Sequence, residues 1–234
     1  MTQDFPRKHP PKLTLLIGNK NYSSWSLRPW LAMKVCNIDF AEVLIPLRHE
    51  NTKQQILKYS LAGHVPVLKL GDFVVWDSLA ILEYLADHHP EAKLWPSDPS
   101  DRAIARAIAA EAHSGFGGVR SAFPMNLKRS SSRTVPLDVL PELKRLDYIM
   151  GEMRQELARE GGFLYGQFGA VDAMLAPYAT RMASYKLPVS VQTREYVAAI
   201  YALPAFKQWQ QAALQEPWKI TETDDIDYRT PVRR

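Results

Sequence analysis

The sequence has a single cysteine, Cys36, among its 234 residues. No disulfide can form within the chain, and this composition fits a reducing compartment. Cys36 ends a helical pattern, where a small buried side chain is more common than a reactive thiol. No His, Cys or Asp spacing is typical of a metal site, so we expect no metal. The pair His88-His89 ends a predicted helix, where a favourable contact with the helix dipole explains the two histidines better than a metal site does.

Long runs of one residue class are also scarce. No apolar run approaches the roughly 18 residues that span a membrane, so we expect no membrane partner. Residues 1–11 carry prolines and charges but no apolar core like that of a signal peptide, so we expect a flexible leader and a cytoplasmic protein. The net charge of +4 comes from scattered basic residues, which argues against a nucleic-acid partner.

What the sequence does contain is a cluster of serines near its start. An apolar run at residues 13–17 predicts a buried strand, and residues 26–36 predict an amphipathic helix. Ser23, Ser24 and Ser26 lie in and around the junction between them. Such clusters are usually turns or helix caps, so a reactive role needs support from elsewhere in the chain.

Pro29 helps to place the start of this first helix. Proline is best tolerated in the first helical turn, where its missing N–H has no partner to lose, so Ser26 is the earliest comfortable N-cap. Ser23 and Ser24 would then lie just before the helix. The exposed N–H groups and the helix dipole favour an anion there.

The rest of the first half alternates strand and helix patterns. Gly71-Asp72 marks a turn between two apolar strands, which predicts a hairpin. In chain order we expect a strand at 40–47, a helix at 52–59, a strand at 63–70 with a proline at its entrance, a strand at 73–76 and a buried helix at 79–86. This βαβαββα order predicts a mixed sheet with helices packed on it, hence an α/β domain.

The second half has no strand pattern of quality. Residues 90–100 contain several prolines and predict a linker. Helical periodicity follows at 101–123, 137–157, 171–185, 194–201 and 205–214, with a bend expected at the glycines of the first of these. We therefore expect an all-α domain over 101–234.

This organisation resembles the glutathione S-transferases over roughly residues 12–215. Ser23-Ser24-Trp25-Ser26-Leu27-Arg28 is similar to the serine motif of the zeta class, Val65-Pro66 to the family's cis-proline, and Asp77-Ser78 to its Glu/Gln-Ser pair. The resemblance implies a thioredoxin-like glutathione-binding domain at 12–89, a helical substrate domain at 101–234 and a homodimer.

Glutathione, as co-substrate, would bind through backbone and charge. With Pro66 in cis, the N–H and C=O of Val65 could pair with the extended tripeptide as a short added strand. Asp77 would supply negative charge for the γ-glutamyl ammonium, and Ser78 lies where a helix start favours a carboxylate. Asp77 is one methylene shorter than the usual glutamate, so its contact with the ammonium could be looser or bridged by water.

The thiol of glutathione would be activated by a hydroxyl. A hydroxyl that donates to sulfur favours the reactive thiolate, as do nearby helix N-terminal amides. Ser23 matches the zeta-class catalytic serine, with Ser24 as the second candidate and the phenol of Tyr22 as a third. The serine would be a donor and not a covalent nucleophile, because no Gly-x-Ser-x-Gly pattern or His/Asp partner follows.

Further site residues follow from the resemblance. His64 could border the glutathione site, and Asn51 and Lys53 lie where relatives contact the glycyl carboxylate. A small hydrophobic electrophile would bind between the domains. The side chains expected to line that site are Trp25, Phe116, Arg120, Phe123 and Met125. Arg28 could orient the motif, meet the substrate or be a solvated helix residue.

The resemblance implies a glutathione transferase, with a role in detoxification. A glutathione-dependent isomerase, dehalogenase or peroxidase stays open, as does a non-catalytic binding module. A maleylacetoacetate isomerase role is in doubt, because the arginine of that pattern falls on Ser184 and Arg181 is one turn short. Asp172 should reach back to the N–H of Gly169 as half of a capping box, a role in folding.

Overall fold

The computed structural model describes residues 12–157 and 160–228. The expected leader at 1–11 lies outside the described residues. One mixed sheet has the strand order β2-β1-β3-β4, with β1 parallel to β2 and antiparallel to β3, and β3 antiparallel to β4. The first half consists of β1 (Thr14–Ile17), α1 (Ser24–Val35), β2 (Ala41–Leu44), α2 (Thr52–Leu57), β3 (Val67–Leu70), β4 (Phe73–Trp76) and α3 (Ser78–His88), which confirms the predicted βαβαββα order.

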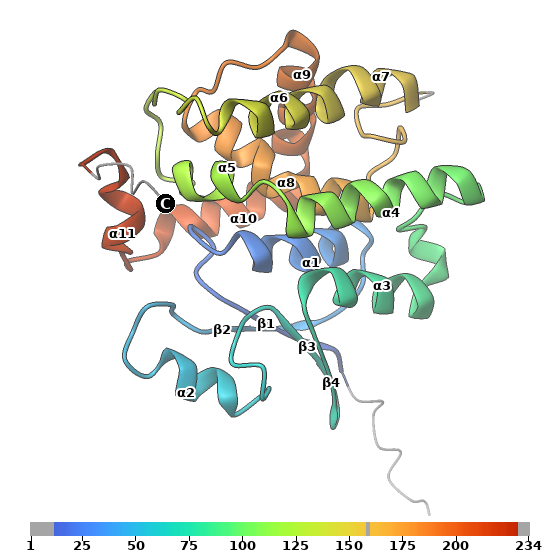
Figure 1. Cartoon of the computed structure of the whole chain (residues 1–234). Coiled ribbons are helices and arrows are strands. Elements are labelled where there is room, and N and C mark those ends of the chain that lie inside the picture. Colours follow the sequence, from blue (N-terminus) through green and yellow to red (C-terminus); the bar gives the residue numbers. More distant parts are fainter. Residues whose placement is uncertain (1–11, 158–159, 229–234) are drawn as a thin grey trace, which may run out of the picture.

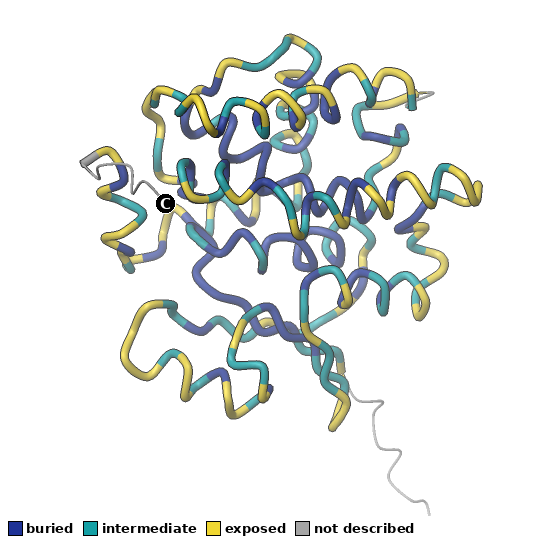
Figure 2. Tube along the Cα trace, in the orientation of Figure 1, coloured by how far each residue is buried: buried dark blue, intermediate teal, exposed yellow. Residues whose placement is uncertain are grey.

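Alternate side chains of β1 enter two different cores, as the period of a strand requires. Leu15 and Ile17 pack in the large core that also contains the helical half, whereas Leu16 packs with Ile56 of α2. Figure 1 shows α1 and α3 between the sheet and the helical half, and α2 on the other side of the sheet. Figure 2 shows that the buried backbone is continuous from the sheet through α1.

The second half is helical, apart from isolated β-bridges within residues 163–167. α8 is buried along nearly its whole length and packs against α1 and α4, so it joins the two halves. Within the described ranges, no helix has the length and apolar character to cross a bilayer. The elements are η1 (Pro90–Ala92), α4 (Pro99–Ser114), α5 (Gly117–Ala122), α6 (Leu140–Tyr148), the π-helix η2 (Ile149–Met153), α7 (Arg154–Leu157), α8 (Ala170–Ser184), α9 (Val191–Ala202), α10 (Pro204–Gln215), α11 (Thr221–Asp224) and η3 (Ile226–Tyr228).

Two predicted helices are interrupted. The helix expected at 101–123 ends at Ser114 and restarts at Gly117, because Phe116 adopts a left-handed conformation with φ of 57°. The helix expected at 137–157 contains the π-turn of η2. A Cβ on Gly151 in that turn would lie 2.9 Å from Ser190 Oγ, so glycine lets α9 approach closely.

The start of α1 also differs from the prediction. Ser23, not Ser26, is the N-cap, and Pro29 lies inside the helix. Pro29 cannot donate to the carbonyl of Trp25, so one helical hydrogen bond is missing. The buried packing of α1, which includes Trp30 at 1% exposure, outweighs that loss.

The predicted linker at 90–100 is packed rather than extended into solvent. It carries η1 and the first residues of α4, and Leu94 and Trp95 are 2% and 8% exposed. The division of the chain into domains at this segment stays a prediction.

Candidate functional site

The serine cluster caps the N-terminus of α1. The Ser26 N–H donates to Ser23 Oγ at 3.4 Å, and the two hydroxyls share a hydrogen bond of 2.7 Å. Ser26 Oγ also accepts the Gly18 N–H at 3.1 Å, which ties the helix start to the end of β1. Ser23 is 6% exposed and Ser24 8%. Since hydroxyl protons rotate to suit their partners, either serine of the 23–26 pair can be the donor in the bond between them.

Ser23 and Ser24 line a cavity of about 380 Å³. The cavity lies between the start of α1, the loop before α2 and the segment before β3. Its other lining residues are Tyr22, Trp25, Leu47, Arg48, Thr52, Ile56, Gly63, His64 and Val65. Asn51 and Lys53 are exposed and do not line it, whereas Arg48 and Thr52 beside them do.

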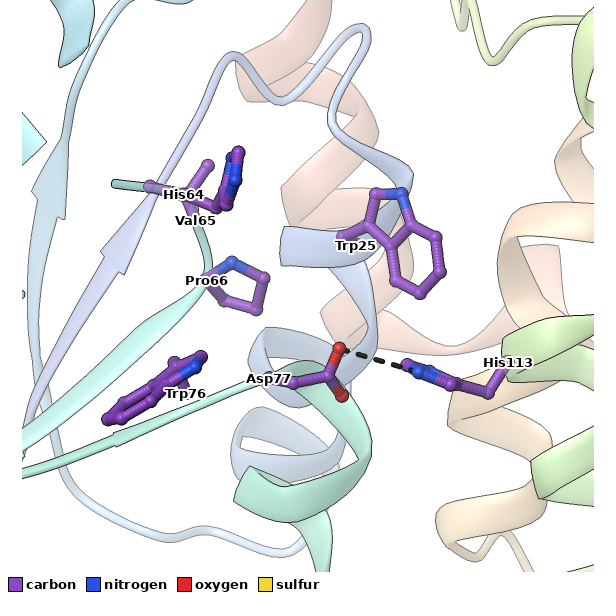
Figure 3. A pocket seen from close by; sticks show the side chains of 7 residues that line it. All are labelled: Trp25, His64, Val65, Pro66, Trp76, Asp77 and His113. Atoms are coloured by element: carbon purple, nitrogen blue, oxygen red, sulfur yellow. Dashed lines mark ion pairs between the residues drawn. The ribbon is translucent and has the colours of Figure 1, made fainter. Parts of the chain in front are cut away.

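A second cavity of about 370 Å³ adjoins the first and shares Trp25, His64 and Val65 with it. Figure 3 shows its lining: Trp25 from α1, the segment His64 to Pro66, Trp76 and Asp77 at the end of β4, and His113 from α4. The two cavities together run from the N-terminus of α1 to the N-terminus of α3.

Val65 lies where the cavities meet. The Val65–Pro66 peptide bond is cis. β3 begins two residues later, at Val67, and no hydrogen bond from another described residue reaches the backbone N–H or C=O of Val65. Those two groups are therefore available to a ligand with an extended backbone.

Asp77 is the N-cap of α3. Its Oδ1 accepts the Leu79 N–H at 2.8 Å, and its Oδ2 lies 3.5 Å from His113 Nε2 of α4, the pair drawn in Figure 3. The carboxylate is 42% exposed. Ser78, in contrast, is fully buried, and its hydroxyl accepts a hydrogen bond from Arg28 at 3.2 Å. Ser78 lines neither cavity.

Arg28 is a buried link between the halves and not a solvated helix residue. It is 1% exposed, and its second terminal nitrogen donates to the Ala112 carbonyl at 3.1 Å. Its guanidinium lies 4.1 Å from the centre of the Trp25 ring, behind the wall of the second cavity. Burial lowers the pKa of Arg28 to about 10. The residue thus places a positive charge beneath Trp25 without lining either cavity.

Of the residues expected to meet an electrophile, Trp25 lines the two cavities. Phe123 and Met125 are 0% and 2% exposed and belong to the helical core. Phe116 packs edge-on against Tyr178, because the left-handed turn at residue 116 directs it inward. These three side chains line neither cavity. Arg120 also lines neither cavity. Its guanidinium lies 5.9 Å from the centre of the Trp25 ring and donates to the Gly115 carbonyl and to the Tyr178 hydroxyl.

The sequence interpretation missed His113 and Trp76 in the second cavity. His113 lies three residues before Phe116, so the same helical spacing included it. The break after Ser114 explains why His113 faces the cavity and Phe116 does not. Trp76 carried no signal beyond its place at the end of a strand.

Tyr22, the third candidate for the hydroxyl that donates to the glutathione thiol, already has a partner. The Tyr22 hydroxyl donates to the Asp224 carboxylate, 3.0 Å from each oxygen. Burial and the nearby Asp224 raise the pKa of Tyr22. Burial likewise raises the pKa of Cys36, whose Sγ lies 3.7 Å from the Ala92 carbonyl and which lines neither cavity. Among the described residues, no group of His, Cys, Asp and Glu is arranged to hold a metal ion.

Asp172 makes the predicted contact with the Gly169 N–H, at 2.9 Å. It is fully buried and also accepts the Leu164 N–H and the Tyr196 hydroxyl. Burial raises the pKa of Asp172 to about 6. Arg181 is buried too, and it binds the carbonyl oxygens of Phe123 and Pro177.

Residues 22–88 match the family model for the glutathione S-transferase N-terminal domain. A probable maleylacetoacetate isomerase of Caenorhabditis elegans is 39% identical over 93 residues, which are 40% of this chain and 42% of that relative. A zeta-class glutathione S-transferase of Euphorbia esula is 34% identical over 98 residues, which are 42% of this chain and 44% of that relative. The chain thus spans less than half the length of these curated relatives.

Solved structures match over nearly the whole chain. A glutathione transferase homolog from Burkholderia, solved with bound glutathione, has a TM-score of 0.67 at 22% identity and covers 87% of this chain and 99% of its own. An Omega 2S glutathione transferase from Trametes versicolor has a TM-score of 0.66 at 23% identity and covers 91% and 99%. At these identities the likeness shows the fold.

Proposed function

Because residues 22–88 match the family model of the glutathione S-transferase N-terminal domain, and the described chain shares its fold with solved glutathione transferases, we propose that this protein binds glutathione and transfers it to a small electrophile. One observation carries the proposal. Two adjoining cavities join the N-terminus of α1, with its serines, to the N-terminus of α3, with Asp77, and the free backbone of Val65 lies between them.

The γ-glutamyl end of glutathione would lie at Asp77. One carboxylate oxygen caps α3, which leaves the other, beside His113, for the ammonium group. The γ-glutamyl carboxylate would accept N–H groups from the first turn of α3, including that of Ser78. Ser78 would contribute its backbone N–H, while its buried hydroxyl accepts the hydrogen bond from Arg28.

The cysteinyl and glycyl parts would cross Val65 into the first cavity. The cysteinyl backbone would pair with the N–H and C=O of Val65. The glycyl carboxylate would meet Arg48, which lines this cavity, in place of the expected Asn51 and Lys53, which do not. The Thr52 hydroxyl already donates to the Pro46 carbonyl, so we give it no role in binding.

The sulfur would lie beside Ser23. If Ser26 donates its hydroxyl hydrogen to Ser23 Oγ, the Ser23 hydroxyl is free to donate to the thiolate, and Gly18 holds Ser26 in place. The α1 dipole adds to the same effect. Ser24, whose hydroxyl makes no hydrogen bond with the rest of the described chain, is the second candidate. The bound glutathione would then be ionised near neutral pH, ready to attack an electrophile.

The electrophile would enter the second cavity beside the bound γ-glutamyl end, next to Trp25, which lines both cavities. Trp25, Trp76 and the two imidazoles of His64 and His113 form its walls, which suits a small hydrophobic or planar molecule. Glutathione-dependent isomerisation is the second candidate, because several matched relatives are named maleylacetoacetate isomerase. The burial of Arg181 away from the cavities does not favour it. A homodimer, a cytoplasmic location and a role in detoxification belong to the same proposal and rest on the family resemblance alone.

Retention on immobilised glutathione, followed by turnover of a generic aryl halide, tests the proposal. We expect elution by free glutathione and a measurable rate of conjugation. Retention without turnover of any member of a broad electrophile panel would favour a non-catalytic binding module instead. No retention and no turnover would contradict the proposal.

A further inference from the structure

The segment after α10 folds back on the loop that carries the serines into α1. Figure 1 shows α11 beside the start of α1, although the two are separated by nearly the whole chain. We call residues 19–23 the serine loop and residues 216–228 the tail segment. The contacts between them are polar and largely buried.

The Glu216 carboxylate accepts two hydrogen bonds from the backbone of the serine loop. Its two carboxylate oxygens accept the N–H groups of Lys20 and Asn21, at 2.6 and 3.0 Å. Glu216 is 8% exposed, so water cannot easily take its place as the acceptor of these two N–H groups. On the other side of the same residues, Trp209 of α10 donates its indole N–H to the Lys20 carbonyl at 2.9 Å.

Asp224 of α11 accepts a hydrogen bond from Tyr22, the residue before Ser23. It accepts the Tyr22 hydroxyl at 3.0 Å and the Asn126 amide N–H at 2.8 Å. The Asn126 amide oxygen in turn accepts the Asn21 amide N–H at 3.1 Å, and the Lys128 N–H donates to the Asn21 amide oxygen at 3.0 Å. The loop is therefore held at three consecutive residues by groups from the second half of the chain.

The loop holds itself together less fully. Within it, the N–H groups of Tyr22 and Ser23 donate to the Asn19 carbonyl. Without Glu216, the buried N–H groups of Lys20 and Asn21 would lose their acceptors, and an unsatisfied buried donor is costly. The loop would then rearrange to reach water, and Ser23, one residue beyond Tyr22, would move with it.

We propose that the tail segment positions the serine loop, with Glu216 and Asp224 as positioning residues for the chemistry at Ser23. The inference rests on the proposed function for its catalytic consequence, but not for its structural one. The tail segment touches neither cavity of the candidate site, apart from the hydrogen bond of Asp224 to Tyr22. It would therefore act through the loop and not by contacting glutathione.

Hydrogen exchange tests the structural part without any activity. We expect the amides of residues 18–26 to exchange at least about tenfold faster in Glu216→Ala than in the wild type, as expected for the loss of charge-assisted hydrogen bonds. Glu222→Gln is the matched control, because it also removes one negative charge but at an exposed position of α11. It should leave the exchange rates of these amides unchanged. Unchanged exchange of residues 18–26 in a folded Glu216→Ala protein would overturn the proposal.

Kinetics of Tyr22→Phe, Asp224→Ala and the double variant test the catalytic part. Both single changes break the hydrogen bond between Tyr22 and Asp224, and Asp224→Ala also removes the acceptor of the Asn126 amide. Each should lower kcat/KM for glutathione by about tenfold or more and move the acidic limb of its pH profile upward. The double variant should be no worse than the worse single variant, because the bond is lost only once. Tyr22→Phe is conservative enough to keep the fold if Asp224→Ala does not.

The outcomes separate the two proposals. A lower melting temperature with an unchanged pH profile would mean a purely structural tail and would overturn the positioning role. Loss of activity in Tyr22→Phe but not in Asp224→Ala would also overturn it, because the phenol would then act on the thiol directly. A wild-type protein that neither binds nor turns over glutathione would defeat the proposed function, while the exchange experiment would still decide whether the tail holds the loop.

Discussion

Replacing Ser23 by alanine removes one hydroxyl to which the structure and the proposed mechanism give two separate tasks. As the N-cap of α1 it accepts the Ser26 N–H, and loss of a serine cap costs about 1 kcal/mol. For a chain of this size that lowers the melting temperature by about 2–4 °C. As the proposed donor to the thiolate it makes a bond to a charged group, worth about 1.5–3 kcal/mol, so conjugation at pH 7 should fall about tenfold or more. Glutathione affinity should change little, because the tripeptide backbone and charges are held elsewhere.

Steady-state kinetics at pH 7 together with thermal unfolding distinguish the two tasks. Ser23→Thr keeps the hydroxyl and is the matched control, with activity expected near that of the wild type. Ser26→Ala removes the hydrogen-bond partner of Ser23 but no contact with sulfur, and should give a smaller loss. If Ser24→Ala loses conjugation and Ser23→Ala does not, the assignment to Ser23 is wrong. If Ser23→Ala shows only the lower melting temperature, Ser23 is a cap and nothing more.

Three further predictions concern the buried and charged groups. Asp172→Ala leaves the Leu164 and Gly169 N–H groups without an acceptor, so its melting temperature should fall by about 10 °C while kcat of the folded protein stays unchanged; unchanged stability would contradict this role. Burial raises the pKa of Asp172 from 3.8 to about 6. The protonated side chain therefore contributes its full stabilisation below pH 3.8, and about 3 kcal/mol of unfolding free energy is lost as the pH rises through 6. The difference in unfolding free energy between wild type and Asp172→Asn, measured across this pH range, should show that loss. Asp77→Asn keeps the cap on α3 but loses the charge, so KM for glutathione should rise about tenfold with little change in kcat, whereas an equal loss with a tripeptide lacking the α-amino group would exclude an ammonium contact.

The pattern of the first half was sufficient to predict its order of strands and helices. Short apolar runs bounded by turn residues, such as Gly71-Asp72, have few alternative readings, and the hydrophobic face of α1 is continuous. The placement of Asp77 at a helix start follows from local rules of capping. Local rules failed at Pro29, because burial of α1 outweighs the hydrogen bond that proline removes.

The wall of the second cavity could not be predicted in the same way. Phe116 and Phe123 share helical spacing with His113, but the left-handed turn at Phe116 changes the direction of the chain, and Phe116 and Phe123 lie in the core. A glycine-rich stretch signals a bend without giving its direction. Sequence patterns also did not reveal that the Ser78 hydroxyl accepts a hydrogen bond from Arg28, because the two residues are 50 positions apart.

The tail segment shows the same limit. Residues after Glu216 are charged and aperiodic, so no sequence pattern connects them to the serine loop. The bond between the Lys20 N–H and Glu216 joins positions 196 residues apart. Contacts of this kind depend on how α10 packs against α1, which only the folded chain determines.

The titration of the sulfur in the bound state is the most direct test of the central claim, that the N-terminus of α1 keeps glutathione ionised. Ultraviolet difference spectra of the glutathione complex, recorded across pH, report the thiolate directly. A free thiol titrates near about 8.5, and a charge-assisted bond of about 1.5–3 kcal/mol predicts a pKa about one to two units lower in the complex. The pKa in the Ser23→Ala complex should return toward the free value. A bound thiol that titrates like free glutathione in the wild-type protein would contradict the account.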